Sequence, residues 1–207
     1  ILDGIDEADY EVIDCTGKTI LPGLVDSHTH FIFGGYREDE FNWRLNGDSY
    51  ISIMERGGGI IASTRATRAA SLEELMAVGR KRLRSLAGFG VATVEGKSGY
   101  GLDKTTELRQ LETMAGLNQE DLIRVIPTYM GPHEVPLEFK GRADEYLDFC
   151  LTEVLPAVKA ANLAVFCDIF TEKGVFDIEQ SRRYLSACRD AGFGIRMHAD
   201  ELFAEFG

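Results

Sequence analysis

Short apolar runs alternate along the chain with longer segments in which apolar residues recur every three or four positions. The short runs predict β-strands and the periodic segments predict helices, an alternation typical of βα units around a parallel sheet. We therefore predict an α/β fold with five strands, over Gly23–His30, Gly90–Glu95, Ile123–Tyr129, Leu163–Phe170 and Phe193–His198.

Helix-start signals precede the periodic segments between these strands. Ser71 and Glu74 have the spacing of a capping box, in which each side chain bonds the other residue's backbone N–H. Asp103 and Asp177 are expected N-caps of two further helices. These signals predict where three of the helices begin.

Some segments are predicted to be less regular. A helix is expected from Asp144 to Lys159, but Pro156 should end or kink it. Residues 31–70 form a long excursion after the first strand, with a short apolar helix near Ser49 to Met54. Long insertions at such a position are usually functional.

The first twenty residues read as a separate hairpin. Strands are expected over Tyr10–Cys15 and Lys18–Leu21, joined by a turn at Thr16-Gly17.

Composition narrows the classes of function. A net charge of −12 disfavours binding to nucleic acid or to anionic membranes. No apolar run approaches the length of roughly 18 to 20 residues that a membrane span needs. The four cysteines form no C-x-x-C pair, which favours reduced, mostly buried thiols and a cytoplasmic location.

All four histidines lie at or just beyond the C-terminal ends of predicted strands. His28 and His30 end the first strand on one face, His133 follows the third strand, and His198 ends the fifth. A lone His-x-His pair is often an ordinary structural feature. Because parallel strand ends converge, however, four histidines there favour a metal site. His28, His30 and His198 are the expected ligands of one zinc or iron ion.

Glu201 lies three residues after His198, where a carboxylate could relay a proton between water and substrate. A solvated loop acid is the alternative, and Asp200 is a weaker candidate for the same role.

The motif LPGLVDSHTH is similar to the first-strand signature of the amidohydrolase superfamily. Further motifs along the chain are SHTHFIFGGYREDEFNWRLNG, GGGIIASTRATRAAS, VEGKSGYGLDKTTELRQL, DIFTEKGVFDIEQSRRYL and MHADEL. Together they resemble the imidazolonepropionase family within that superfamily, and the resemblance extends over essentially all 207 residues.

The resemblance implies a distorted TIM (β/α)8 barrel and a β-sandwich domain. This chain would supply about five barrel strands in residues 21–207, and residues 1–20 would be a remnant of the sandwich. Because the chain starts at Ile1 and stops at Gly207, just after the fifth strand, we expect it to be part of a longer protein. A metal-binding Asp of the eighth strand and a His of the sixth would lie beyond it, so this portion alone should be inactive.

The resemblance also implies roles for individual residues. It assigns metal binding to His28, His30 and His198, substrate binding to Arg37, Tyr100, His133 and Glu201, and catalysis to Glu201 and His133. Arg37 would hold a substrate carboxylate through its planar fork, although a surface salt bridge with Glu38 or Glu40 is the alternative. Neutral His133 would hydrogen-bond the substrate carbonyl.

The implied reaction is the metal-dependent hydrolysis of 4-imidazolone-5-propanoate to N-formimidoyl-L-glutamate, a step of histidine degradation. Two alternatives stay open: another cyclic amidase or deaminase of the superfamily, and a non-catalytic metal-stabilised binding protein. A small molecule is the expected partner, and a homodimer is compatible with the sequence, which identifies no interface.

Overall fold

The computed structural model describes residues 11–49, 52–53 and 56–201, and its central element is a curled, five-stranded parallel sheet. The strands follow the order β1-β2-β3-β4-β6, and each neighbouring pair is parallel. A second, two-stranded parallel sheet pairs β5 with β7. The strands are β1 (Leu24–Thr29), β2 (Val91–Lys97), β3 (Arg124–Tyr129), β4 (Phe166–Cys167), β5 (Phe170–Thr171), β6 (Gly194–Ile195) and β7 (His198–Ala199).

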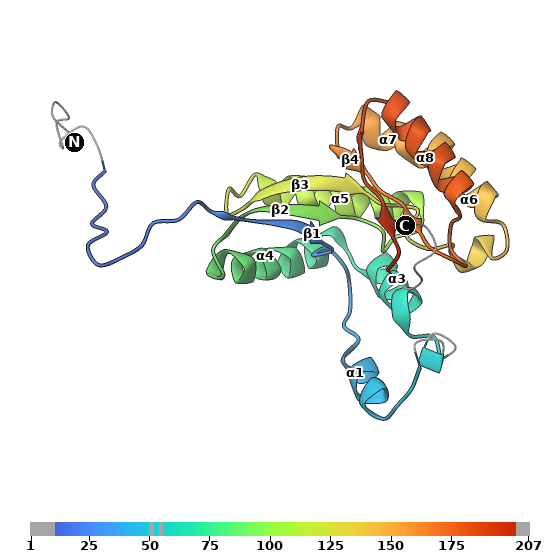
Figure 1. Cartoon of the computed structure of the whole chain (residues 1–207), viewed down its shortest axis with the longest axis horizontal. Coiled ribbons are helices and arrows are strands. Elements are labelled where there is room, and N and C mark those ends of the chain that lie inside the picture. The colour runs from blue at the N-terminus through green and yellow to red at the C-terminus, as the bar shows by residue number, and fades with distance from the viewer. Residues whose placement is uncertain (1–10, 50–51, 54–55, 202–207) are drawn as a thin grey trace.

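Helices connect the strands, and α4 and α5 pack beside the central strands (Figure 1). The helices are α1 (Glu38–Leu45), α3 (Gly59–Ala69), α4 (Leu72–Gly88), α5 (Lys104–Asn118), α6 (Ala143–Phe149), α7 (Leu155–Ala160) and α8 (Ile178–Asp190), with a 3-10 turn at Leu137–Phe139. Among the described residues, the length and polarity of the helices exclude a membrane crossing by any of them.

The predicted helix starts are confirmed. Ser71 accepts the backbone N–H of Glu74 at 3.1 Å, and Glu74 accepts that of Ser71 at 2.8 Å. Asp103 and Asp177 cap α5 and α8 through their side chains. Because these bonds link residues three positions apart, the local sequence is sufficient to predict them.

The helix expected over Asp144–Lys159 is interrupted as its proline suggested. A π-helical segment over Cys150–Val154 separates α6 from α7, and Pro156 stands in the first turn of α7. A proline in that position has no N–H to give to the preceding turn. The wider π-helical turn accommodates Pro156, and the chain stays helical from α6 through α7.

The first three strands are confirmed, but the fourth and fifth are each split. The segment predicted as Leu163–Phe170 divides into β4 and β5, and Phe193–His198 divides into β6 and the start of β7. Asp168 lies at the first break, where its Oδ1 accepts the backbone N–H of Ile169 at 2.7 Å. That bond removes one N–H group from the pairing of the five-stranded sheet. The chain then continues into β5, which pairs with β7 in the second sheet.

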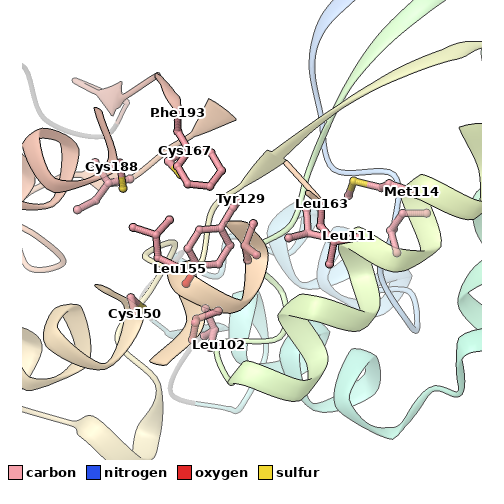
Figure 2. Close-up of a cluster of buried hydrophobic side chains, with 14 of the residues drawn as sticks. Leu102, Leu111, Met114, Tyr129, Cys150, Leu155, Leu163, Cys167, Cys188 and Phe193 are labelled. Atoms are coloured by element: carbon pink, nitrogen blue, oxygen red, sulfur yellow. The ribbon is translucent and has the colours of Figure 1, made fainter. Parts of the chain in front are cut away.

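The core lies between the sheet and the helices. Tyr129 of β3 is fully buried at its centre, with Leu111 and Met114 of α5 on one side and Cys150 and Leu155 on the other (Figure 2). Burying an apolar side chain of this size contributes about 1.5–3 kcal/mol. These contacts fix the β3 end next to the histidines.

The excursion over residues 31–70 contains two helices that the sequence pattern did not predict. The buried side of α3 carries Ser63, Thr64 and Thr67 rather than an apolar stripe. The Thr67 hydroxyl accepts the N–H of Gly34 and donates to the carbonyl of Ser63. Helix α1 is mostly exposed and also lacks a stripe.

The expected helix from Ser49 to Met54 falls largely outside the described residues.

The predicted N-terminal hairpin is wrong for the residues described. The turn at Thr16-Gly17 is present, but residues 11–15 and 18–21 form no strand. Val12, Ile13 and Ile20 are 65%, 75% and 76% exposed. The segment extends away from the sheet and does not pair with it (Figure 1). Its membership of a β-sandwich stays a prediction.

Candidate active site

Three histidines converge where β1 ends and β7 begins. Imidazole nitrogens of His28, His30 and His198 all lie within 4.8 Å of one another, one from each residue. Nε2 of His28 and Nε2 of His198 are 2.9 Å apart, although 170 positions separate the two residues in sequence. The fold therefore brings together the three residues that strand spacing and strand-end convergence had indicated.

The chemistry of these nitrogens fits a bound cation. Asp168 Oδ1 lies 3.0 Å from Nδ1 of His198, and a carboxylate can only accept, so this nitrogen carries the proton. The lone pair of His198 Nε2 then points toward His28. Nδ1 of His30 is buried and has no hydrogen-bond partner among the described residues. Neutral imidazole nitrogens of this kind bind zinc and iron.

The surroundings of His28 and His30 favour the neutral form of these two rings. Burial holds the pKa of His30 well below its usual range, and neighbouring His133 lowers that pKa further. Burial and then the nearby His198 lower the pKa of His28. Metal ligation requires a deprotonated imidazole nitrogen, so the environment removes a competing proton.

His133 and Tyr100 stand against the histidine cluster. The His133 ring stacks on His30 with 4.7 Å between centroids, and the Tyr100 ring lies 5.1 Å from His30. Burial lowers the pKa of His133 to about 4, and its Nδ1 is 2.9 Å from the carbonyl of Gly99. Since a carbonyl only accepts, Nδ1 carries the proton and Nε2 is an acceptor. Neutral His133 therefore suits a substrate N–H, not the carbonyl expected from sequence.

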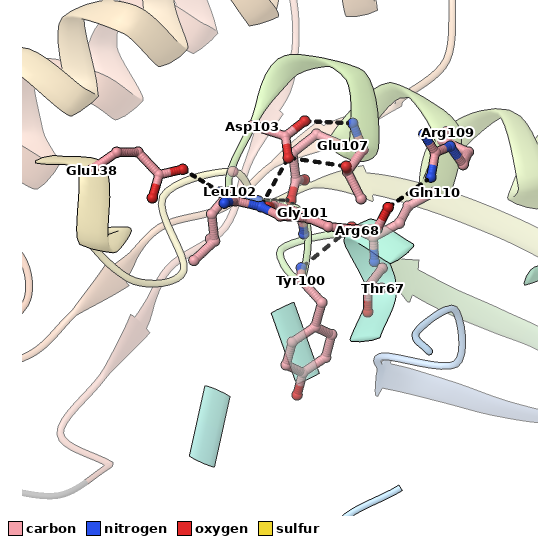
Figure 3. A network of polar contacts seen from close by, with 12 residues as sticks. Thr67, Arg68, Tyr100, Gly101, Leu102, Asp103, Glu107, Arg109, Gln110 and Glu138 are labelled. Atoms are coloured by element: carbon pink, nitrogen blue, oxygen red, sulfur yellow. Dashed lines mark hydrogen bonds and ion pairs between the residues drawn. The ribbon is translucent and has the colours of Figure 1, made fainter. Parts of the chain in front are cut away.

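The loop that carries Tyr100 is held from beneath by a buried carboxylate. Glu107 accepts the backbone N–H groups of Gly99, Gly101 and Leu102 at 2.7–3.0 Å. Burial raises the pKa of Glu107, while these hydrogen bonds oppose the rise. Figure 3 shows Tyr100 projecting from this loop, away from the network that anchors it.

Four buried or half-buried charges form a network that sequence reasoning missed in part. Lys97 Nζ lies 2.9 Å from Glu95 Oε1 and 2.7 Å from Asp168 Oδ2. Arg196 Nε lies 2.8 Å from Glu95 Oε1, which also accepts the Thr128 hydroxyl at 2.6 Å. Asp168 and Arg196 are the members that the sequence analysis did not name.

Asp168 had a signal in the sequence, namely an acid inside the apolar run AVFCDIF. Burial would raise the pKa of Asp168, but the hydrogen bond from His198 and the charge of Lys97 hold it below the usual value. Asp168 is therefore ionised. Its partners come from β2 and β7, so their identity required the tertiary structure.

A cavity of about 560 Å³ opens beside the histidine cluster. Its lining includes His28, Lys97, Asp168, Arg196 and Glu201. The lining is mainly charged or polar, which suits a small polar ligand better than an apolar one.

Glu201 reaches this cavity through a sharp turn after β7. The turn passes through Asp200, which has a left-handed φ of 57°. The backbone N–H of Glu201 then donates to Glu172 Oε2 at 3.1 Å. The structure thus places Glu201 at the cavity that also receives His198, as proton relay would require.

Arg37 is placed differently from the other candidates. It precedes α1, and its NH1 group lies 3.6 Å from Glu40 Oε2. The described contacts do not bring Arg37 to the histidines. The salt-bridge alternative is thus the arrangement seen in this structure.

Comparison with known proteins finds a family model and a solved structure that this chain resembles. The family model described as "Amidohydrolase family" matches residues 11–55, which include His28 and His30. A solved structure of 5-methylcytosine deaminase from Klebsiella pneumoniae superposes with a TM-score of 0.60, covering 87% of this chain and 40% of that one. At 18% identity, that likeness supports the half-barrel fold alone.

Curated relatives are much more similar in sequence. The imidazolonepropionase of Parabacteroides distasonis is 54% identical over 98% of this chain and 49% of its own length. Those of Phocaeicola vulgatus and Clostridium tetani are 55% and 51% identical, over 47% and 48% of their lengths. The chain spans about half the length of these relatives. The resemblance of this chain to the amidohydrolase family and to imidazolonepropionases is confirmed.

Proposed function

We propose that the protein containing this chain is a metal-dependent hydrolase that opens the cyclic amide of 4-imidazolone-5-propanoate to N-formimidoyl-L-glutamate. The observation that carries the metal-dependent chemistry is the group of His28, His30 and His198, whose nitrogens lie within 4.8 Å of one another. The choice of substrate is supported by relatives at 51–55% identity that carry the name imidazolonepropionase. Histidine degradation in the cytoplasm is the corresponding setting.

We assign the metal to zinc or iron, held by these three histidines and by a carboxylate from elsewhere in the protein. Such an ion would act as a Lewis acid and lower the pKa of a water molecule to about 7. Water attack on the ring carbonyl forms the new C–O bond, and the C–N bond of the cyclic amide breaks.

The residues of this chain would manage protons and substrate orientation. Glu201 takes a proton from the attacking water and returns it to the ring nitrogen that leaves. His133 accepts a hydrogen bond from a ring N–H through Nε2, and Tyr100 bonds the substrate through its hydroxyl. Neutral His133 suits this task because its pKa of about 4 keeps it unprotonated at neutral pH.

Arg37 would bind the propionate carboxylate after leaving Glu40. Its ion pair is long, at 3.6 Å, and the Arg37 side chain is 36% exposed, so little free energy opposes the exchange. Glu40 keeps a second partner, the N–H of Gly59 at 2.7 Å. A movement within residues 31–70 would bring the guanidinium to the substrate.

The test combines metal analysis with turnover. The purified protein should contain zinc or iron and remove imidazolone absorbance, and it should act poorly on cytosine and on cyclic amides that lack a carboxylate. The variants His28→Ala and His30→Ala should lose both metal and activity. His133→Gln is the matched control, which should lose activity but keep the metal. Undiminished metal in the two alanine variants, or no turnover by the metal-loaded protein, contradicts the proposal.

A further inference from the structure

Asp168 is oriented by donors on every side. It is 1% exposed and stands at the break between β4 and β5. Oδ1 lies 3.0 Å from Nδ1 of His198 and accepts the N–H of Ile169 at 2.7 Å, while Oδ2 accepts from Lys97 Nζ at 2.7 Å. These bonds leave the carboxylate no freedom to turn away from His198.

We propose that Asp168 is a positioning residue that fixes His198 as its Nδ1–H tautomer and thereby keeps Nε2 available as a metal-binding nitrogen. This inference rests on the proposed function, in which His198 is a ligand. Asp168 acts through His198 and is not itself one of the three clustered donors. Partners of this kind fix the orientation and basicity of a ligating imidazole.

Lys97 and its neighbours stabilise the buried, ionised carboxylate of Asp168. The network contains two carboxylates, Glu95 and Asp168, and two cations, Lys97 and Arg196. Their charges balance, and buried charges are strongly destabilising only when a partner is missing. Lys97 also has a directional role, because its ammonium group can only donate and demands an oxygen from residue 168.

Because Lys97 requires an oxygen from residue 168, Asp168→Asn is a specific test of the proposal. The amide has one oxygen and one NH2 group. Facing the NH2 group toward the Lys97 ammonium would bury a donor against a charged donor, which is less favourable than facing it toward the neutral N–H of Ile169, so the oxygen should face Lys97. The NH2 group then faces His198, whose Nδ1 must become the acceptor and whose Nε2 must carry the proton. The isosteric variant should therefore hold His198 in the wrong tautomer for ligation.

Removing Lys97 as well should correct the tautomer. In the double variant Asp168→Asn/Lys97→Met, the amide oxygen is free to face the N–H of Ile169 and Nδ1–H of His198. The net charge equals that of the unaltered protein, and Glu95 keeps Arg196 and Thr128. A merely structural role for Asp168 predicts the opposite, since two buried changes should do more damage than one.

Two measurements should be made on the protein that contains this chain. The first is zinc affinity from competition with a chelator, which we expect to fall roughly 10- to 100-fold in Asp168→Asn and to recover most of that loss in the double variant. The second is the His198 tautomer in the metal-free protein, from long-range ¹H–¹⁵N NMR. His198 should carry its proton on Nδ1 in the unaltered protein, on Nε2 in Asp168→Asn, and on Nδ1 again in the double variant.

A core variant separates these effects from loss of stability. Leu83→Ala leaves a cavity in α4, where Leu83 is 1% exposed, and should lower the melting temperature without changing the tautomer or zinc affinity. An unchanged tautomer in Asp168→Asn, or a double variant that binds zinc no better than the single one, overturns the proposal. The NMR result does not depend on turnover, so failure to hydrolyse the imidazolone would count against the proposed function alone.

Discussion

Arg37 and Glu40 form an ion pair beside the first turn of α1. The Arg37 guanidinium is loosely held, because its side chain is 36% exposed and its single ion pair, with the buried Glu40, is long at 3.6 Å. If Arg37 instead binds the substrate carboxylate, Arg37→Met should lower kcat/KM roughly ten- to a hundredfold, mainly through KM. That range corresponds to about 1.5–3 kcal/mol for a charge-assisted hydrogen bond. Steady-state kinetics on 4-imidazolone-5-propanoate measures it.

The control for Arg37 lies in the same excursion. Arg56 is 53% exposed and pairs with Asp48 at 2.8 Å, so Arg56→Met removes an equivalent charge and should leave kcat/KM unchanged. A substrate analogue without the propionate carboxylate should not distinguish Arg37→Met from the unaltered protein. Equal turnover of the true substrate by both proteins would remove Arg37 from the site.

Individual residues differ in how far the sequence can assign them. His28 and His30 share a strand face by spacing alone, and His198 follows from the convergence of strand ends. The acceptor character of His133 could not be predicted, because it depends on the Gly99 carbonyl 34 positions away.

At the scale of elements, local sequence signals were sufficient to predict where helices begin. Features that depend on long-range contacts could not be predicted in this way. The caps of α4, α5 and α8 depend on residues three positions apart, and all three helices begin where predicted. The breaks in the fourth and fifth strands depend on where Asp168 and its partners meet. Helix α3 was missed because its buried face is polar, so hydrophobic periodicity gave no signal.

The start of α5 is coupled to the Tyr100 loop through Glu107, which accepts three backbone N–H groups. Glu107→Gln turns one acceptor into a donor that faces an N–H group. We expect a loss of about 1–3 kcal/mol in unfolding free energy, because a buried donor is left unsatisfied. The displaced Tyr100 should also raise KM. Urea denaturation and kinetics measure the two effects.

Glu120→Gln is the matched control on the same side of the fold. Glu120 pairs with Arg80 at 2.6 Å near the end of α5, but that pair is solvent-accessible. Its loss should change the unfolding free energy little and leave KM unchanged. If both glutamine variants behave alike, Glu107 has no special part in holding the loop.

At the scale of the whole molecule, the described sheet has two unpaired outer strands. Leu24 and Val25 of β1 are 55% and 68% exposed, and Ile195 of β6 is 47% exposed. Exposed apolar edge strands invite pairing or coverage. Because the chain spans about half the length of its relatives, we propose that further barrel elements cover these strands in the protein that contains it.

This proposal predicts that Val25→Asp is far more damaging than the exposure of Val25 suggests. Covering a valine contributes about 1.5–3 kcal/mol, and an unpaired carboxylate in its place adds a desolvation penalty. The variant should therefore unfold at a clearly lower temperature than the unaltered protein. Phe89 is 75% exposed in the turn between α4 and β2, so Phe89→Asp is a matched control that should change the melting temperature little. Calorimetry of both variants decides the matter: equal melting temperatures would mean that the β1 edge stays in contact with water, and that the half-barrel is not completed there.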